Sequence, residues 1–353
     1  MPERPPPQRG RGAAINPPNR FEPLWYSRDP EWNDLEDPAL ETQFFRDTSR
    51  SIITYNDSPD VGFDASINPY RGCEHGCIYC YARPTHEYLG FSAGLDFESK
   101  ILVKEDAPEL LRRELSSPRW KPQVLAISGV TDSYQPIERR LQLTRRCLQV
   151  LAEFRNPVVI ITKNHLVTRD VDILSELAQY EAARVFLSVT TLDGGLSRVM
   201  EPRASHPLRR LAAIEMLSQA GVPTGVLVAP VIPGLTDHEL PSIITAAVQA
   251  GARAAGYVTL RLPHGVGPLF EQWLTQHFPD RKDKVLHRIR AIRGGQLNDP
   301  RFSSRMRGEG IFAEQIAALF ALACRKAGID RRGPALSTAA FRMPSNSQLP
   351  LFE

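Results

Sequence analysis

Short apolar runs alternate with longer amphipathic stretches along the middle of this 353-residue chain. The short runs are rich in β-branched residues and predict strands, whereas the stretches between them have helical periodicity. Predicted strands cover 123–128, 158–162, 185–189, 225–232 and 256–260, and a first strand ends near Tyr70. Six βα units are fewer than the eight of a closed barrel. The sequence therefore predicts an α/β fold, an open, partial (βα)6 barrel with its active site at the C-terminal ends of the strands.

The rest of the chain differs from this pattern in composition. Residues 1–50 are rich in proline, arginine and acidic residues without apolar periodicity, which predicts a disordered tail. Residues 51–265 contain the βα units and form the predicted core. Residues 266–345 predict a helical, basic extension with a break at Gly294–Gly295. Within the core, helices are predicted over 136–154, 171–180, 207–220 and 239–250.

Charge and hydropathy exclude some classes of protein. No apolar stretch approaches the roughly 20 residues needed to cross a bilayer, and the N-terminus lacks the apolar core of a secretory signal. The sequence thus predicts a cytoplasmic protein with no membrane partner. The formal net charge of +3 is too small to identify a partner.

The five cysteines are distributed unevenly, because three of them lie within eight residues. In a reducing cytosol an odd number with such a cluster indicates a metal site rather than a disulfide framework. Cys73, Cys77 and Cys80 have the spacing Cys-x3-Cys-x2-Cys and follow the first predicted strand. Three thiolates can hold three irons of a [4Fe-4S] cluster and leave the fourth iron open to a ligand. Cys147 and Cys324 fall inside predicted helices, so neither is an obvious fourth ligand.

Two other interpretations of this loop remain open. His75 or His86 could complete a four-coordinate zinc site, or the thiols could have no metal at all.

This loop, with Tyr79 directly before its last cysteine, resembles the signature of the radical S-adenosylmethionine (SAM) superfamily. The resemblance implies that a [4Fe-4S] cluster binds SAM at its open iron and cleaves it after one-electron reduction. The 5′-deoxyadenosyl radical so formed abstracts hydrogen from a substrate. A low-potential electron donor such as flavodoxin or ferredoxin is implied as a partner.

Polar residues follow several predicted strands, where such a cofactor would need contacts to its amino-acid end, ribose and adenine. The predicted cofactor-binding residues are Tyr79, Ser128, Gly129, Thr131, Asp132, Lys163, Ser188, Glu201, Arg203 and Pro230. Plainer roles are open for most of them: a solvent-facing turn at 128–132, a surface position for Lys163, a backbone partner for Ser188 or core packing at Pro230. Glu201 and Arg203 could also pair with each other.

Four motifs resemble a narrower family, the DNA repair photolyase-like branch related to spore photoproduct lyase. These motifs are Asn68–Cys73, Thr131–Pro136, Glu201–Arg203 and Pro230–Gly234, and the resemblance covers about 66–262. It implies reversal of a thymine dimer lesion by radical chemistry.

The family's tyrosines beside the cluster are matched by Tyr79 and Tyr81, and a cysteine in the family returns hydrogen to the product. Aligning Asp132 with the family places Gly129 where that cysteine belongs. The radical chemistry is therefore implied, the lyase reaction is not, and the catalytic residues are not identified.

A basic segment from Arg281 to Arg307 could neutralise phosphates, with Phe302 or Trp273 as stacking surfaces, or it could be a solvated helix face. We expect a radical enzyme acting on a nucleic-acid or nucleotide-derived substrate. One alternative is a radical SAM enzyme with a small-molecule or protein substrate. Another is a non-catalytic, metal-stabilised nucleic-acid-binding protein.

Overall fold

Six parallel strands form the centre of the main sheet. The computed structural model describes residues 7–22, 40–329 and 333–344. The parallel strands are β3 (Ala65–Ile67), β6 (Leu125–Ile127), β7 (Val158–Thr162), β8 (Ala183–Ser188), β9 (Thr224–Val231) and β10 (Ala254–Thr259). They lie in chain order, and the antiparallel strand β2 (Ile53–Tyr55) extends the edge at β3. The six predicted strands are thus present in an α/β fold, while their curvature into a partial barrel stays a prediction.

A second, three-stranded sheet lies beside the first and corrects one boundary. Its strands are β1 (Gln43–Arg46), β5 (Lys100–Val103) and β4 (Tyr70–Arg71). The first parallel strand of the main sheet ends at Ile67 rather than near Tyr70, because Pro69 has no backbone N–H to continue the ladder. Tyr70 instead pairs with Val103 in the second sheet.

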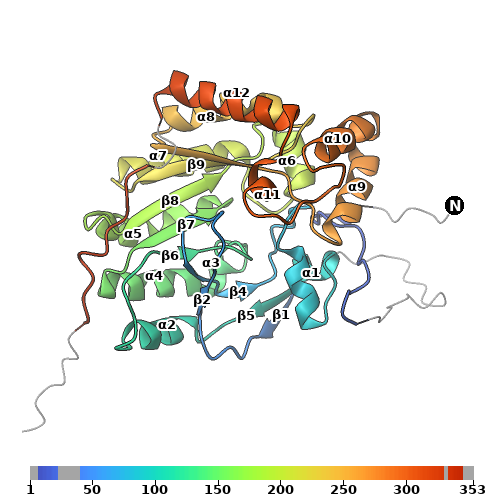
Figure 1. Cartoon of the computed structure of the whole chain (residues 1–353). Helices are drawn as coiled ribbons and strands as arrows, with labels where there is room; N and C mark the ends of the chain where they lie inside the picture. The colour runs from blue at the N-terminus through green and yellow to red at the C-terminus, as the bar shows by residue number, and fades with distance from the viewer. Residues whose placement is uncertain (1–6, 23–39, 330–332, 345–353) are drawn as a thin grey trace, which may run out of the picture.

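Helices connect the strands and cover the sheet (Figure 1). The connecting helices are α4 (Leu143–Phe154), α5 (Val171–Ala178), α7 (Pro207–Gln219) and α8 (Leu240–Gln249). Shorter helices are η1 (Arg83–Leu89), α1 (Leu95–Ser99), α2 (Ala107–Leu115), α3 (Glu138–Leu141), η2 (His165–Asp170), α6 (Gly194–Met200) and η3 (Asp237–Glu239). The helix predicted over 136–154 is divided at Gln142, whose φ is 52°.

The C-terminal extension is helical, as predicted, and packs against the core. It contains α9 (Val266–His277), α10 (Pro279–Ala291), α11 (Ser304–Arg307) and α12 (Ile311–Ala327). Helix α12 lies on α8 (Figure 1). Trp273 of α9 and Leu286 of α10 belong to the same apolar cluster as Cys77 and Tyr79. No helix in the described part of the chain is long and apolar enough to cross a membrane.

The N-terminal strap, residues 7–22, packs on the loop that carries the three cysteines. The backbone N–H groups of Gly12 and Ala13 donate to the Glu98 carboxylate at 2.9 and 2.9 Å. The Arg11 guanidinium donates to the Glu98 carbonyl oxygen at 2.7 Å and to Thr42 Oγ1 at 3.1 Å. These contacts fix the strap at three successive residues.

The prediction of a tail over residues 1–50 is therefore wrong for the residues that the structure describes. Residues 7–22 dock on the core, and residues 43–46 form a strand that pairs in parallel with β5. Residues 1–6 and 23–39 lie outside the described residues. Composition suggested a tail because the docking uses backbone N–H groups and polar side chains such as Arg11, Asn16 and Asn19, and composition does not show whether such groups meet protein or water.

Replacing Gly12 by alanine should dislodge the strap, because an added Cβ would lie 1.8 Å from the carbonyl oxygen of Gly76. We expect the free energy of unfolding to fall by about 1–3 kcal/mol, the usual cost of forcing extra atoms into a packed site. Hydrogen exchange at the Gly12 and Ala13 amides should become faster. Gly62→Ala is the control, since nothing lies within 4 Å of its Cβ position. Unchanged exchange in Gly12→Ala would show that the strap is not held there.

Candidate active site

The three clustered cysteines come from one loop between β4 and η1. Cys73 and Cys77 are buried and Cys80 is partly buried, and none of them forms a disulfide. Gly72 and Gly76 turn the loop with φ values of 78° and 66°, a conformation that side chains with a Cβ rarely adopt.

The thiols are electrostatic neighbours of one another and of two carboxylates. Burial raises the pKa of Cys73, and the charges of Asp132 and the other thiols raise it further. Burial also raises the pKa of Cys77, with Glu201 adding to the effect. The loop therefore keeps protonated thiols at neutral pH, and a metal would have to displace those protons on binding.

Arg83, three residues after the last cysteine, holds the backbone of the loop. It is fully buried, and its guanidinium donates to the carbonyl oxygens of Cys77 at 3.0 Å and Gly94 at 2.9 Å. It also pairs with Glu98, the carboxylate that receives the strap. The buried ion pair between Arg83 and Glu98, whose hydrogen bonds are satisfied, therefore holds the backbone of the cysteine loop in place.

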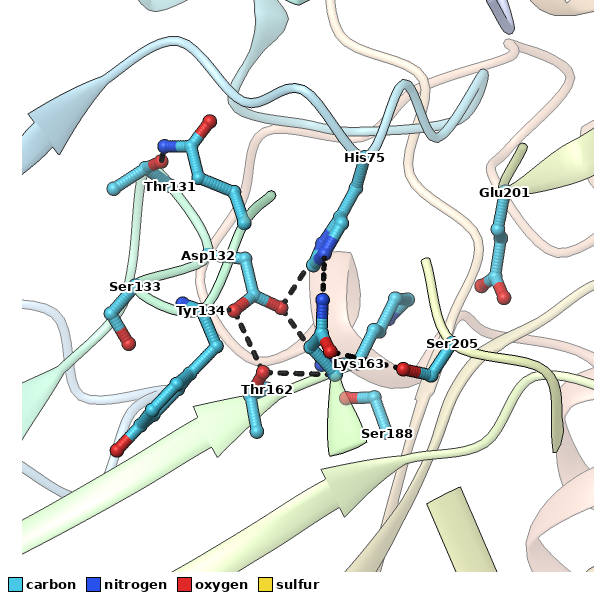
Figure 2. Close-up of polar contacts among 12 residues, drawn as sticks. His75, Thr131, Asp132, Ser133, Tyr134, Thr162, Lys163, Ser188, Glu201 and Ser205 are labelled. Atoms are coloured by element: carbon cyan, nitrogen blue, oxygen red, sulfur yellow. Dashed lines mark hydrogen bonds and ion pairs between the residues drawn. The ribbon is translucent and has the colours of Figure 1, made fainter. Parts of the chain in front are cut away.

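His75, inside the loop, is held on both ring nitrogens (Figure 2). Nδ1 lies 3.3 Å from Asp132, and Nε2 lies 3.0 Å from the amide nitrogen of Asn164. The Asn164 carbonyl oxygen already accepts from the N–H of Leu166 and the hydroxyl of Ser205, so its amide nitrogen must donate to His75. Both ring nitrogens of His75 therefore have protein partners, and neither is left for a metal.

Asp132 ties this histidine to the end of β7. Its carboxylate accepts from the Lys163 N–H at 2.8 Å and from the Thr162 hydroxyl at 2.7 Å (Figure 2). Burial alone would raise the pKa of Asp132, but His75 and these hydrogen bonds outweigh it and lower the pKa to about 2. The carboxylate is ionised and its oxygens are used within the protein.

Glu201 fixes the aromatic residue of the cysteine loop. Its carboxylate receives the Tyr79 hydroxyl, the Arg210 guanidinium and, at 2.8 Å, the Thr190 hydroxyl. Burial would raise the pKa of Glu201, but the charges of Arg210 and Lys163 and these hydrogen bonds lower it to about 2.

Glu201 and Arg203 do not pair with each other in the structure. Arg203 lies 3.2 Å from Glu74 and donates to Thr42 Oγ1 at 3.1 Å.

The other predicted site residues lie at the C-terminal ends of the strands. The Lys163 ammonium donates to the Ala229 carbonyl oxygen at 3.1 Å and lies 5.8 Å from the centre of the Tyr79 ring. Thr131 donates to the Gly72 carbonyl oxygen at 2.6 Å. Ser188 is buried at the end of β8, and Pro230 lies in β9. Cofactor contacts by these residues stay predictions.

Gly129 has a backbone conformation that residues with a side chain rarely adopt. Its φ is 123°, and its carbonyl oxygen accepts from the Tyr81 hydroxyl. A Cβ at this position would meet only Asn68 Nδ2, at 4.0 Å. Space for a side chain is present, but the backbone conformation disfavours one.

The basic segment Arg281–Arg307 is mostly occupied with the protein's own groups. Four of its cations are in ion pairs: Lys282 with Glu271, Arg288 with Asp237, Arg301 with Asp299 and Glu309, and Arg305 with Asp60. Arg293 and Arg307 donate to backbone carbonyl oxygens around β10. Fewer cations of this segment are therefore available to bind nucleic acid than the sequence suggested.

Sequence reasoning missed several residues that shape the site. They are Glu98, Asn164, Arg210 and Arg261, together with the positioning role of Arg83. Arg83 lies close to the cysteine motif, and Arg261 directly follows the strand predicted over 256–260, so their positions could have indicated a role. No neighbouring sequence feature indicated that Glu98, Asn164 or Arg210 would contribute to the site.

Comparison with known proteins identifies the class. The family model of the radical SAM superfamily matches residues 67–247. The chain belongs to this superfamily, whose members are enzymes that use an iron–sulfur cluster and SAM and generally need a reductant.

Several relatives are similar over different parts of the chain. A Mycobacterium tuberculosis protein that is itself uncharacterised is 35% identical over 282 residues, covering 79% of this chain and 80% of the relative. An uncharacterised protein of Methanocaldococcus jannaschii is 31% identical over 173 residues, covering 49% and 62%. Among solved structures, a mutant of spore photoproduct lyase matches with a TM-score of 0.54 and 15% identity, covering 80% of this chain and 78% of that one. At this identity the likeness shows the fold alone.

Replacing Glu201 by glutamine should strongly destabilise the protein, because it leaves the buried Arg210 guanidinium without its counter-charge. We expect a loss of about 3–5 kcal/mol in the free energy of unfolding, measured by chemical denaturation. Glu309→Gln is the matched control, since Glu309 and Arg301 form an exposed pair with side chains 60% and 63% exposed. That change should cost less than about 1 kcal/mol.

The pH dependence should distinguish the two variants as well. The folded-state pKa of Glu201, about 2, lies below its usual value, so its contribution is present above about pH 4.5 and is lost as the pH falls toward 2. In Glu201→Gln the free energy of unfolding should therefore lack the loss that this carboxylate causes as the pH falls below about 4.5. Equal losses of stability in both variants would contradict the role given to the buried pair.

Proposed function

We propose that this chain is a radical SAM enzyme in which Cys73, Cys77 and Cys80 hold a [4Fe-4S] cluster. The observation that carries the proposal is one loop with three thiols free of disulfides, fixed by buried ion pairs at the C-terminal ends of parallel strands. When bound, the cluster supplies the electron that cleaves SAM to a 5′-deoxyadenosyl radical, which abstracts hydrogen from the substrate. The reductant is a low-potential donor such as flavodoxin or ferredoxin.

The donor set favours a cluster over a single zinc ion. Among the described residues, no group of three or more His, Cys, Asp and Glu side chains converges on a single-ion site. In a cubane cluster each thiolate binds a different iron, so the thiols need not converge on one point. Both ring nitrogens of His75 have partners. Nε2 of His86 lies 2.9 Å from the Lys100 carbonyl oxygen, and its Nδ1 is buried without a hydrogen-bond partner, but His86 belongs to no such group among the described residues.

The predicted cofactor-binding residues divide into two groups. Lys163, Ser188 and Pro230 lie at or near strand ends, and we assign them to the carboxylate, ribose and adenine of SAM. The turn at Ser128 and Gly129 is assigned to its amino group. The charge of Lys163 acts on both Cys77 and Cys80, beside those of Arg210 on Cys77 and Arg83 on Cys80.

Thr131, Asp132, Glu201 and Arg203 already have protein partners. We assign these residues to positioning the cysteine loop, with Tyr79 held by Glu201 beside the cofactor.

The same proposal covers the finer organisation of the chain. Residues 51–265 form the catalytic core as a partial (βα)6 barrel, and residues 266–345 form the helical extension. The enzyme acts in the cytoplasm on a nucleic-acid or nucleotide-derived substrate. Because glycine stands at position 129, the hydrogen-returning thiol of spore photoproduct lyase has no counterpart there, and the reaction is not assigned as a lyase reaction.

The test is anaerobic cleavage of SAM. Protein reconstituted with iron and sulfide, reduced with dithionite and given SAM should form 5′-deoxyadenosine, detected by chromatography and mass spectrometry. Cys77→Ala should abolish this product, because it removes one of three iron ligands. Cys147→Ala, a change at a buried helical cysteine, is the control and should retain cleavage. Cleavage by Cys77→Ala, or none by the loaded wild-type protein, would refute the proposal.

A further inference from the structure

Arg261 lies at the end of the last parallel strand, two residues after β10. Its guanidinium lies 5.2 Å from the centre of the Tyr81 ring. Tyr81 directly follows Cys80, and its hydroxyl donates to the carbonyl oxygen of Gly129, in the turn after β6. Arg261 is therefore next to the residues that border the cysteine loop at the C-terminal side of the sheet.

The guanidinium of Arg261 has unused donors. Within the described residues it forms no ion pair, and its only hydrogen-bond contact is a weak one, from Nη1 to the Met306 sulfur at 3.6 Å. Its Nε is buried without a hydrogen-bond partner. A buried polar group without a partner is uncommon and costly, so this donor is suited to a ligand that brings an acceptor.

The surrounding arginines make the position strongly cationic without competing for a ligand. Arg293 donates to the carbonyl oxygens of Thr259 and Leu260. Arg305 pairs with Asp60, a carboxylate whose charge also acts on Arg261. Arg293 also has an Nε without a hydrogen-bond partner, but both of its terminal nitrogens donate to carbonyl oxygens. The terminal nitrogens of Arg261 contact no protein oxygen among the described residues, so they are the ones open to a ligand.

Flat aromatic surface lies beside these cations. Tyr81 is 49% exposed and Phe302 is 54% exposed, and the Arg305 guanidinium lies 4.4 Å from the centre of the Phe302 ring. An arginine fork recognises the oxygens of a phosphate, and an adjacent exposed ring offers a stacking surface for a base.

We propose that Arg261 binds a phosphate group of the substrate, with Tyr81 beside the attached nucleoside. This inference rests on the proposed function, because it takes the cysteine-loop side of the sheet as the place where the substrate reacts. The phosphate could belong to a nucleic-acid strand or to a mononucleotide.

The test measures binding to the full, cluster-loaded chain in the absence of reductant. A fluorescein-labelled single-stranded oligodeoxynucleotide is titrated by anisotropy over a range of salt concentrations, and thymidine 5′-monophosphate is titrated by calorimetry. Arg261→Gln should weaken binding about tenfold and reduce the slope of log K against log salt by about 0.7, the contribution of one phosphate contact on a single strand. Arg261→Lys keeps the charge without the fork and should restore the salt slope but not the full affinity.

Arg290→Gln is the control, since Arg290 is an exposed arginine of α10 with no ion pair among the described residues. Loss confined to the Arg261 variants supports the site, and the probe that shows the loss identifies polymer or mononucleotide as the source of the phosphate. Equal losses in Arg290→Gln and Arg261→Gln, unchanged binding in Arg261→Gln, or no binding of either probe by the wild-type protein would overturn the inference. Since no SAM is cleaved in this assay, its result is independent of the cleavage test.

Discussion

The buried ion pair between Arg83 and Glu98 is the interaction on which the candidate site depends. Arg83 fixes carbonyl oxygens of the cysteine loop, and Glu98 fixes the backbone of the N-terminal strap. Both side chains are fully buried, so loss of either charge would leave the other uncompensated, at a cost of about 3–5 kcal/mol. One pair thus couples the geometry of the thiols to a segment more than sixty residues before them, with Gly12 lying against Gly76 at the contact.

Two further carboxylates join the same loop to the main sheet. Asp132 reaches it through His75, and Glu201 reaches it through Tyr79. Both are ionised close to thiols whose pKa values are raised, so these thiols favour the neutral form. Binding of iron would convert these thiols to thiolates in a site that already contains negative charge. The buried cations Arg83 and Arg210, with Lys163 at the rim, supply the compensation that such a site requires, which explains why so many charges are gathered there.

The parts that the sequence predicted are those encoded locally. The strands from 123 onward follow from β-branched runs, and the cysteine spacing needs only eight residues to be recognised. The parts that were missed depend on partners distant in sequence: Glu98 receives Gly12 across 86 residues, and Asn164 meets His75 across 89. A buried glutamate and a surface glutamate look the same in a sequence, so the roles of Asp132 and Glu201 as supports could not be separated from cofactor binding. The docking of residues 7–22 was missed for a related reason, since the backbone and polar side chains that hold this segment have partners distant in sequence.

Gly129 and Arg261 show that the site has two sides with different constraints. The side that holds the cysteines is fixed by three charge-assisted contacts, through Glu98, Asp132 and Glu201. On the other side, the turn at Gly129 has a φ of 123° and is held through its carbonyl oxygen by Tyr81. A side chain introduced at 129 would therefore have to adopt this disfavoured backbone conformation, although the space beside it is open. Under the proposed function, radical initiation and substrate choice would be carried by different elements, so that the second could diverge while the first is retained.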